Sequence, residues 1–223
     1  MTAILVILTI IVAVSIDAAL VAWRKSHAPS RAFEPAPMAP MKAPAPPQGV
    51  FLDSAHTWLR ITSDGRLRIG LDDLLSEAVG EVDSVGTPPP GTSVKRGEPL
   101  LRLSVRGRTI VVPSPASGEV MSLNERALTD PRSLTHDPYG SGWIVSLFTR
   151  DHHEAIRPLK IGPAAAAYLR HEFQRFADFL TRQAAPVPVL ADGGVTARGA
   201  VTTLGDAAFG AFVEEFLDNG KEA

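Results

Sequence analysis

The sequence predicts a mainly β domain with the form of a barrel-like sandwich, preceded by one transmembrane helix and followed by a small helical tail. Three observations predict this order: a long apolar run near the N-terminus, short alternating apolar runs separated by turn residues, and apolar residues at helical spacing near the C-terminus. We therefore divide the 223 residues into a transmembrane helix (1–24), a Pro/Ala-rich linker (25–49), a β domain (50–150) and a C-terminal helical extension (151–223).

The apolar run over residues 3–23 has the length of a membrane-spanning helix. It consists mostly of Ile, Val, Leu and Ala, and about 20 apolar residues cross a hydrocarbon core of about 30 Å. No basic residue precedes the run, as one would in a cleaved signal peptide. Asp17 is its one ionisable residue, which we expect either near the membrane interface or against a protein partner. Trp23 ends the run, and we predict that this segment lies in the lipid bilayer.

Positive charges follow the apolar run directly, because Arg24 and Lys25 come immediately after Trp23. Positively charged flanks remain in the cytoplasm. We therefore expect a single-pass protein of the inner (cytoplasmic) membrane, with its N-terminus outside and its soluble domain in the cytoplasm. The linker that follows is rich in proline and alanine, a composition typical of an extended, semi-rigid spacer.

Composition and motifs exclude several classes of function. The formal net charge is -2 and the pI is near 6.3, so there is no basic field to attract nucleic acid. The absence of cysteine excludes thiolate catalysis and cysteine metal sites. No nucleophile elbow or phosphate loop is found, and the adjacent side chains of Asp151-His152-His153-Glu154 point apart. We predict no catalytic residue, no cofactor and no metal, and hence no enzyme.

The β domain begins with a hairpin that joins 57–62 to 66–71 across an Asp64-Gly65 turn. Apolar residues at helical spacing over 72–79 predict a short helix after the second strand. Short apolar runs bounded by Gly, Pro, Asp and Asn then predict further strands. These runs are 81–85, 100–105, 109–112, 118–123 and 142–148.

Five motifs in this region carry a family resemblance. They are His56-Thr57-Trp58-Leu59-Arg60, Ile69-Gly70-Leu71-Asp72-Asp73, Gly91-Thr92-Ser93-Val94-Lys95-Arg96-Gly97-Glu98, Pro115-Ala116-Ser117-Gly118-Glu119-Val120 with Asn124-Glu125 and Leu128, and Asp137-Pro138-Tyr139-Gly140-Ser141-Gly142-Trp143-Ile144. Their order resembles the H protein of the glycine cleavage system, and the last motif is the most specific. The resemblance covers residues 51–149 and implies a lipoyl-type fold of two sandwiched β-sheets with a short helix near the start.

The resemblance also implies where a lipoyl group would be attached. In the family, a lysine at the tip of the hairpin before the P-x-S-G turn is acylated by lipoate. Counting back without gaps from Pro115 places this position at Gly107, and a slip of one residue gives Arg106 or Arg108. A guanidinium does not replace the amine, because it stays protonated and its delocalised nitrogens are poor acyl acceptors. We therefore expect the carrier function to be lost and no lipoyl cofactor to be bound.

Two surfaces are candidates for binding a partner. At the hairpin tip, Arg106 and Arg108 flank Gly107 and can grip a carboxylate, a phosphate or an acidic protein surface. The alternative is a solvated turn whose charges only keep the hairpin soluble. In the tail, helical spacing predicts an amphipathic helix over 164–183 and a second helix over 204–217, with a small hairpin over 187–201 between them.

The second tail helix carries an aromatic stripe formed by Phe209, Phe212 and Phe216. This stripe either packs within the protein or docks onto a partner subunit. We predict a non-enzymatic, membrane-tethered accessory or scaffold subunit that uses a non-lipoylated domain for protein binding in a membrane complex. The alternatives are a lipoyl or one-carbon carrier modified elsewhere, at Lys95 or Lys160, and an efflux-type membrane adaptor.

Overall fold

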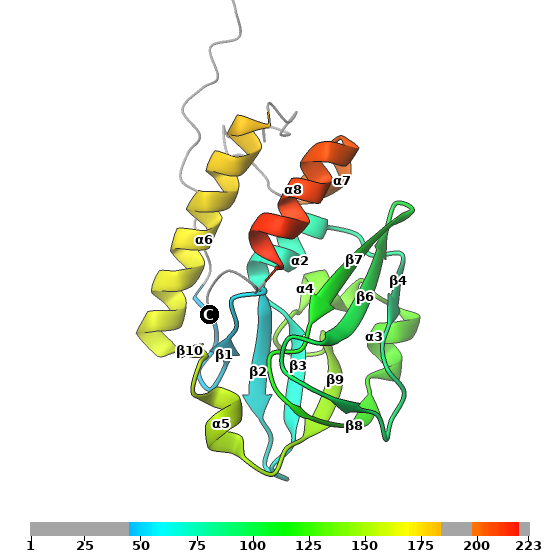
Figure 1. Cartoon of the computed structure of the whole chain (residues 1–223), viewed down its shortest axis with the longest axis vertical. Helices are drawn as coiled ribbons and strands as arrows, with labels where there is room; N and C mark the ends of the chain where they lie inside the picture. Colours follow the sequence, from blue (N-terminus) through cyan, green and yellow to red (C-terminus); the bar gives the residue numbers. More distant parts are fainter. Residues whose placement is uncertain (1–44, 184–197, 219–223) are drawn as a thin grey trace, which may run out of the picture. The chain divides into compact units, whose positions relative to one another are not determined.

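The computed structural model describes residues 45–183 and 198–218 (Figure 1). The predicted membrane helix, with Asp17, Trp23, Arg24 and Lys25, and most of the linker lie outside these residues. No helix within the described ranges is both long enough and apolar enough to cross a membrane. The N-terminal anchor therefore stays a prediction.

Antiparallel strands form two sheets in the described residues, which confirms the mainly β prediction. The larger sheet has the strand order β10-β1-β2-β3-β9-β8-β5, and the smaller has the order β4-β6-β7. The strands are β1 (Phe51–Leu52), β2 (Thr57–Ile61), β3 (Leu67–Leu71), β4 (Ser84–Gly86), β5 (Ser93–Val94), β6 (Pro99–Val105), β7 (Arg108–Pro113), β8 (Gly118–Leu123), β9 (Trp143–Phe148) and β10 (Lys160–Ile161).

Alternation of side chains places one face of the β6–β7 hairpin in the core. Leu101 and Leu103 of β6 lie opposite Val112 and Ile110 of β7, and all four side chains are buried. Residues between them, such as Arg102, are exposed because successive side chains of a strand point to opposite faces. Each aliphatic side chain that is fully buried stabilises the fold by about 1.5–3 kcal/mol.

Seven helices accompany the sheets in the described residues. Three lie in the β domain, α2 (Asp73–Val79), α3 (Glu125–Thr129) and α4 (Ser133–His136), and α5 (His152–Ile156) follows it directly. Three belong to the tail: α6 (Gly162–Arg182), α7 (Ala200–Thr203) and α8 (Asp206–Phe216). The helices predicted over 72–79, 164–183 and 204–217 correspond to α2, α6 and α8.

The predicted tail hairpin is wrong where it can be compared, because its last residues form the short helix α7. Gly199 takes a left-handed backbone conformation with φ 70, and its N–H donates to the carbonyl of Glu77 at 2.8 Å. This contact docks the chain against α2 instead of pairing it as a strand. Residues 187–190 lie outside the described part of the chain.

The loop before β9, which carries the most specific motif, is hydrogen-bonded to β2 and α2. The indole Nε1 of Trp58 donates to the carbonyl of Pro138 at 2.9 Å, and the Tyr139 hydroxyl donates to Asp73 Oδ2 at 2.7 Å. The rings of Trp58 and Tyr139 lie 5.9 Å apart. These contacts join β2 and α2 to the loop and explain why aromatic residues stand at these positions.

The tail helices α6 and α8 lie side by side (Figure 1) and pack together through aromatic rings. Phe176 and Phe179 of α6 meet Phe212 and Phe216 of α8 with ring centroids 5.6–6.2 Å apart. Such aromatic pairs add about 0.5–1.5 kcal/mol each beyond the burial of area. Of the two alternatives for the aromatic stripe, packing within the protein is the arrangement that the structure contains.

Candidate functional site

The β6–β7 hairpin ends in a two-residue turn formed by Arg106 and Gly107. Both residues have positive φ, 47 and 76, which is typical of a type I′ turn. Val105 and Arg108 pair across the base of the turn. A Cβ atom at Gly107 would meet nothing within 4 Å, so this residue lies at an open tip. The tip therefore presents two cations, and the whole hairpin over 99–113 contains no lysine.

The two arginines of the tip have different surroundings. The main-chain N–H of Arg106 donates to Asp83 Oδ2 at 2.7 Å, and the residue is exposed. Arg108 turns instead to the tail: Nη1 donates to the carbonyl of Leu204 at 2.7 Å, and Nη2 donates to Asp206 Oδ1 at 2.8 Å. Its guanidinium also lies 4.9 Å from the ring centroid of Phe209. We call this set of contacts the hairpin clamp.

The three phenylalanines of the α8 stripe differ in how deeply they are buried. Phe209 is half-buried beside Arg108, whereas Phe212 and Phe216 are buried at 0% and 3% exposure. Both buried rings face α6 rather than solvent. A partner reaches Phe212 and Phe216 only if α8 leaves α6, so their predicted role in partner binding remains a prediction that requires this movement.

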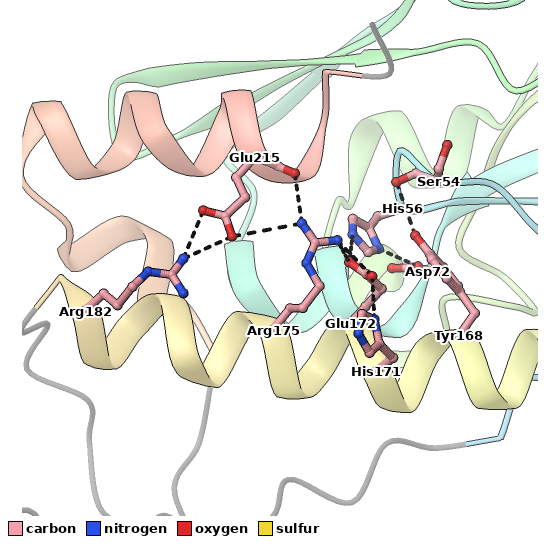
Figure 2. Close-up of polar contacts among 9 residues, drawn as sticks. All are labelled: Ser54, His56, Asp72, Tyr168, His171, Glu172, Arg175, Arg182 and Glu215. Carbon is pink, nitrogen blue, oxygen red and sulfur yellow. Dashed lines mark hydrogen bonds and ion pairs between the residues drawn. The ribbon is translucent and has the colours of Figure 1, made fainter. Parts of the chain in front are cut away.

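A buried polar cluster, which the sequence did not predict, lies where the tail meets the β domain (Figure 2). His56 Nδ1 lies 2.9 Å from Asp72 Oδ2, and His56 Nε2 lies 3.6 Å from Glu172 Oε2. The side chains of His56 and Asp72 are 0% exposed, and that of Glu172 is 4% exposed. We call these three residues the histidine network.

Local structure positions each member of this network. His56 precedes β2 with a positive φ of 59, and its carbonyl accepts from the N–H of Asp72 at 2.9 Å. Asp72 also caps α2, because its Oδ1 accepts from the N–H of Leu75 at 2.9 Å. Glu172 comes from α6. A non-glycine residue with positive φ costs free energy, so the surrounding contacts must hold His56 in place.

The network is charged at neutral pH. Burial by itself lowers the pKa of His56, but the carboxylates of Asp72 and Glu172 outweigh this effect and raise it from 6.5 to about 9. Burial likewise raises the pKa of Glu172, but His56 and Arg175 outweigh this effect and lower it from 4.5 to about 2. The protein therefore holds an imidazolium between two carboxylates.

Ion pairs extend the network from α6 to α8. Arg175 Nη1 donates to both carboxylate oxygens of Glu172, at 2.9 and 2.7 Å, and Nη2 donates to the carbonyl of Glu215 at 3.3 Å. Arg182 Nη2 donates to both carboxylate oxygens of Glu215 at 3.0 Å (Figure 2). Charges of alternating sign thus run from the buried core to the exposed end of α6.

Aromatic rings cover the imidazole of His56 from both tail helices. The ring of Tyr168 on α6 lies 6.1 Å from it, and the ring of Phe216 on α8 lies 6.0 Å from it. The Tyr168 hydroxyl donates to the carbonyl of Ser54 at 3.2 Å. With both His56 and Asp72 fully buried, this arrangement joins the β domain to the tail and does not offer a group to a substrate.

A protein-family model matches the β domain and the first part of the tail. The family model described as Glycine cleavage H-protein matches residues 50–172. The match therefore passes residue 150, where we ended the β domain, and extends through α5 and β10 to Glu172 in α6.

Two related proteins agree with the family model. The glycine cleavage system H protein of Marinobacter nauticus is 35% identical over 117 residues, which is 52% of this chain and 86% of that protein. Glycine cleavage system H protein 2 of Aquifex aeolicus is 28% identical over 130 residues, or 58% of this chain and 81% of that protein. The crystal structure of a glycine cleavage system H protein from Mycobacterium marinum matches with a TM-score of 0.49 at 28% identity, covering 55% of this chain and 98% of that chain. The family model covers more than half of the 223 residues, and the chain belongs to the glycine cleavage H-protein family.

Proposed function

We propose that this chain is a non-lipoylated, membrane-tethered member of the H-protein family that works as a binding subunit of a membrane complex, and not as a carrier or an enzyme. One observation carries the proposal: the tip of the β6–β7 hairpin holds Arg106 and Gly107 where the family resemblance implies a lysine. An arginine guanidinium stays protonated and does not accept an acyl group at neutral pH. A carrier without an acyl acceptor has no arm to move between enzymes.

The contacts of the tip support a binding role. Arg108 already binds a backbone carbonyl, a carboxylate and an aromatic ring of the protein's own tail. These are the groups that guanidinium recognises on a partner surface. The neighbouring Arg106 side chain is exposed and extends from the same turn. The tip is therefore chemically suited to an acidic partner surface.

The membrane tether rests on the sequence alone. The apolar run over 3–23 and the basic pair Arg24 and Lys25 support one N-terminal span with the β domain in the cytoplasm. A tether of this kind keeps a binding domain close to membrane subunits and raises its effective concentration there. We accordingly propose that the partners are subunits of a membrane complex.

Co-purification from mild detergent tests the binding role. We expect the wild-type chain to retain partner subunits and the double reversal Arg106→Glu with Arg108→Glu to lose them, because both charges that meet an acidic surface change sign. Arg126→Glu is the matched control, since Arg126 is an exposed arginine on α3, outside the hairpin. Full assembly with the double reversal would remove the hairpin tip as the binding site.

Family membership favours a second candidate, a carrier that is modified at another lysine. Lys95 lies in the turn between β5 and β6, where its N–H donates to Glu98 Oε2 at 2.8 Å. Lys160 lies in β10 with its ammonium 4.4 Å from the ring centroid of Tyr168. Neither residue is on the β6–β7 hairpin. A lipoyl adduct on either lysine would establish this candidate in place of the first.

A further inference from the structure

The imidazole of His56 faces a carboxylate at each of its two nitrogens. Asp72 belongs to the β domain, whereas Glu172 belongs to the tail helix α6. A neutral imidazole donates from one nitrogen only, so its other nitrogen would point a lone pair at a carboxylate. Both contacts are favourable together only when the ring carries two protons. The geometry around His56 is therefore a geometry for imidazolium.

The two contacts differ in how firmly they are held. The Asp72 contact is short, and Asp72 is also fixed as the cap of α2. On the other side, Glu172 lies 3.6 Å from Nε2, and within the described residues Nε2 has no hydrogen-bond partner. A neutral ring would keep its one proton on Nδ1, toward Asp72. Loss of a proton would therefore weaken the contact between the β domain and α6.

The contact between His56 and Glu172 also supports α8, through residues that link α6 to α8. Glu172 binds Arg175, and Arg175 binds the carbonyl of Glu215 on α8. Phe216 of α8 covers the imidazole directly. The start of α8 in turn supplies Asp206 and Phe209 to the hairpin clamp. One buried ring is therefore linked through a series of side-chain contacts to the tail helix that occupies the hairpin.

We propose that His56 is a proton-dependent latch: the protonated ring holds α6 and α8 on the β domain, and the neutral ring releases α8 from the β6–β7 hairpin. Other charged and titratable groups surround the ring and its partners. They are Asp53 and Asp72 of the β domain, Tyr168, His171, Glu172 and Arg175 of α6, and Glu215 of α8.

The pH range of release follows from proton linkage. His56 has a higher pKa in the folded protein, about 9, than its ordinary 6.5. Its stabilising contribution is therefore fully present below 6.5 and is lost as the pH rises through about 9. The pKa of Glu172 is lowered to about 2, so this carboxylate keeps its charge throughout that range. The titrating member of the latch is the histidine.

The consequence of release for partner binding rests on the proposed function, since an uncovered hairpin matters only if the hairpin binds something. The docking of α8 does not rest on it. A direct measurement of docking therefore separates a failure of the latch from a failure of the binding role.

The absence of cysteine allows two spin labels to be placed specifically in the full-length chain. Ala207→Cys on α8 and Arg102→Cys on β6 are both exposed, and the distance between their labels reports docking. We expect one short distance below pH 6.5 and a growing population of longer distances as the pH rises through about 9. In Glu172→Gln, which keeps the shape and removes the charge, the longer distances should begin at lower pH. An unchanged distance across this range in the wild type, or the same midpoint in both proteins, would overturn the latch.

Two further measurements keep the test decisive. His171→Gln removes the exposed histidine that touches the same carboxylate, and its midpoint should equal that of the wild type. A midpoint that moves in this variant would assign the release to His171 and overturn the proposal. Should Glu172→Gln fold poorly, NMR titration of the His56 ring in the wild type replaces it. Titration well above 6.5 supports the latch, and titration at or below 6.5 contradicts it.

Discussion

The tail meets the β domain at two places of opposite character. In the hairpin clamp, the paired side chains of Arg108 and Asp206 are 29% and 98% exposed. In the histidine network, His56 and Asp72 are 0% exposed and Glu172 is 4% exposed. Exposed ion pairs contribute about 0–1 kcal/mol, whereas breaking a buried pair costs about 3–5 kcal/mol. Similar chemistry therefore has different consequences at the two places: the buried contact holds the tail, and the exposed contact is the one that we propose a partner replaces.

The largest effect is expected from the buried aromatic contact that accompanies the histidine network. Phe212→Ala should lower the free energy of unfolding by about 3–5 kcal/mol, because it leaves a cavity against Phe176 and Phe179. Urea unfolding of the chain measures this loss. Phe209→Ala is the matched control: its ring is half-buried at the clamp, and we expect a clearly smaller loss. Equal losses would mean that the two regions do not differ in energy.

Removing one charge from the network should have the next largest effect. Glu172→Gln should cost about 2 kcal/mol near neutral pH, less than removal of a buried partner, because the amide oxygen still accepts from Arg175 and the hydrogen bonds lose only their charge on this side. Urea unfolding of wild type and variant at a series of pH values measures the difference.

The difference in unfolding free energy between wild type and Glu172→Gln should change with pH at both the acidic and the alkaline end. Glu172 has a lower pKa in the folded protein, so its contribution is present above 4.5 and is lost as the pH falls through about 2. The His56 contribution is lost as the pH rises through about 9. The difference between the two proteins should thus be largest between 4.5 and 6.5. Burial raises the pKa of Asp73 to about 6, but Asp73 is common to both proteins and cancels. A difference that is flat with pH would contradict the assignment.

The β domain was largely predictable because its signals are local. Turn glycines, alternating apolar residues and contiguous motifs indicate strands wherever they occur, and the amphipathic run predicted α6 to within two residues of Gly162–Arg182. The histidine network was not predicted, because its members are 16 and 100 positions apart in the sequence. One signal was present: Glu172 stands three residues after Leu169 and four before Phe176, on the apolar face of its helix.

The contacts of Arg108 were not predictable for a related reason. The hairpin and its tip follow from a turn and two short strands, which are features of neighbouring residues. The groups that bind Arg108 belong to Leu204 and Asp206, which come almost a hundred residues later in the sequence. Nothing in the local pattern of an Arg-Gly-Arg turn distinguishes a free guanidinium from one that binds the protein's own tail.

Placing a lysine at the hairpin tip should lower the free energy of unfolding modestly and should not lead to lipoylation. Gly107→Lys places a side chain at φ 76, and we expect a loss of about 1 kcal/mol in urea unfolding. Incubation with a lipoate ligase should leave the variant unmodified, because Arg106 and Arg108 still flank the new amine. Thr109→Lys is the control for stability, since Thr109 is exposed in β7 without a positive φ. Ready lipoylation of Gly107→Lys would show that the surrounding surface remains that of a carrier.

The smallest effect is expected from the exposed charges of the clamp. Arg106→Glu with Arg108→Glu should lower the free energy of unfolding by less than about 1 kcal/mol, because Asp206 is almost fully exposed to water. Thermal melts at low and high salt measure this change, and added salt should reduce it further. A loss as large as that of Phe212→Ala would make the clamp a structural contact and not an exchangeable one.

The central claim is that this chain does not carry a lipoyl group, at the hairpin tip or at another lysine. Intact-mass measurement of the chain, isolated from cells that lipoylate their other carrier proteins, tests this claim most directly. We predict the mass of a polypeptide without a lipoyl group. A mass increase equal to one lipoyl group, located by peptide mapping at Lys95 or Lys160, would contradict the claim and establish a carrier.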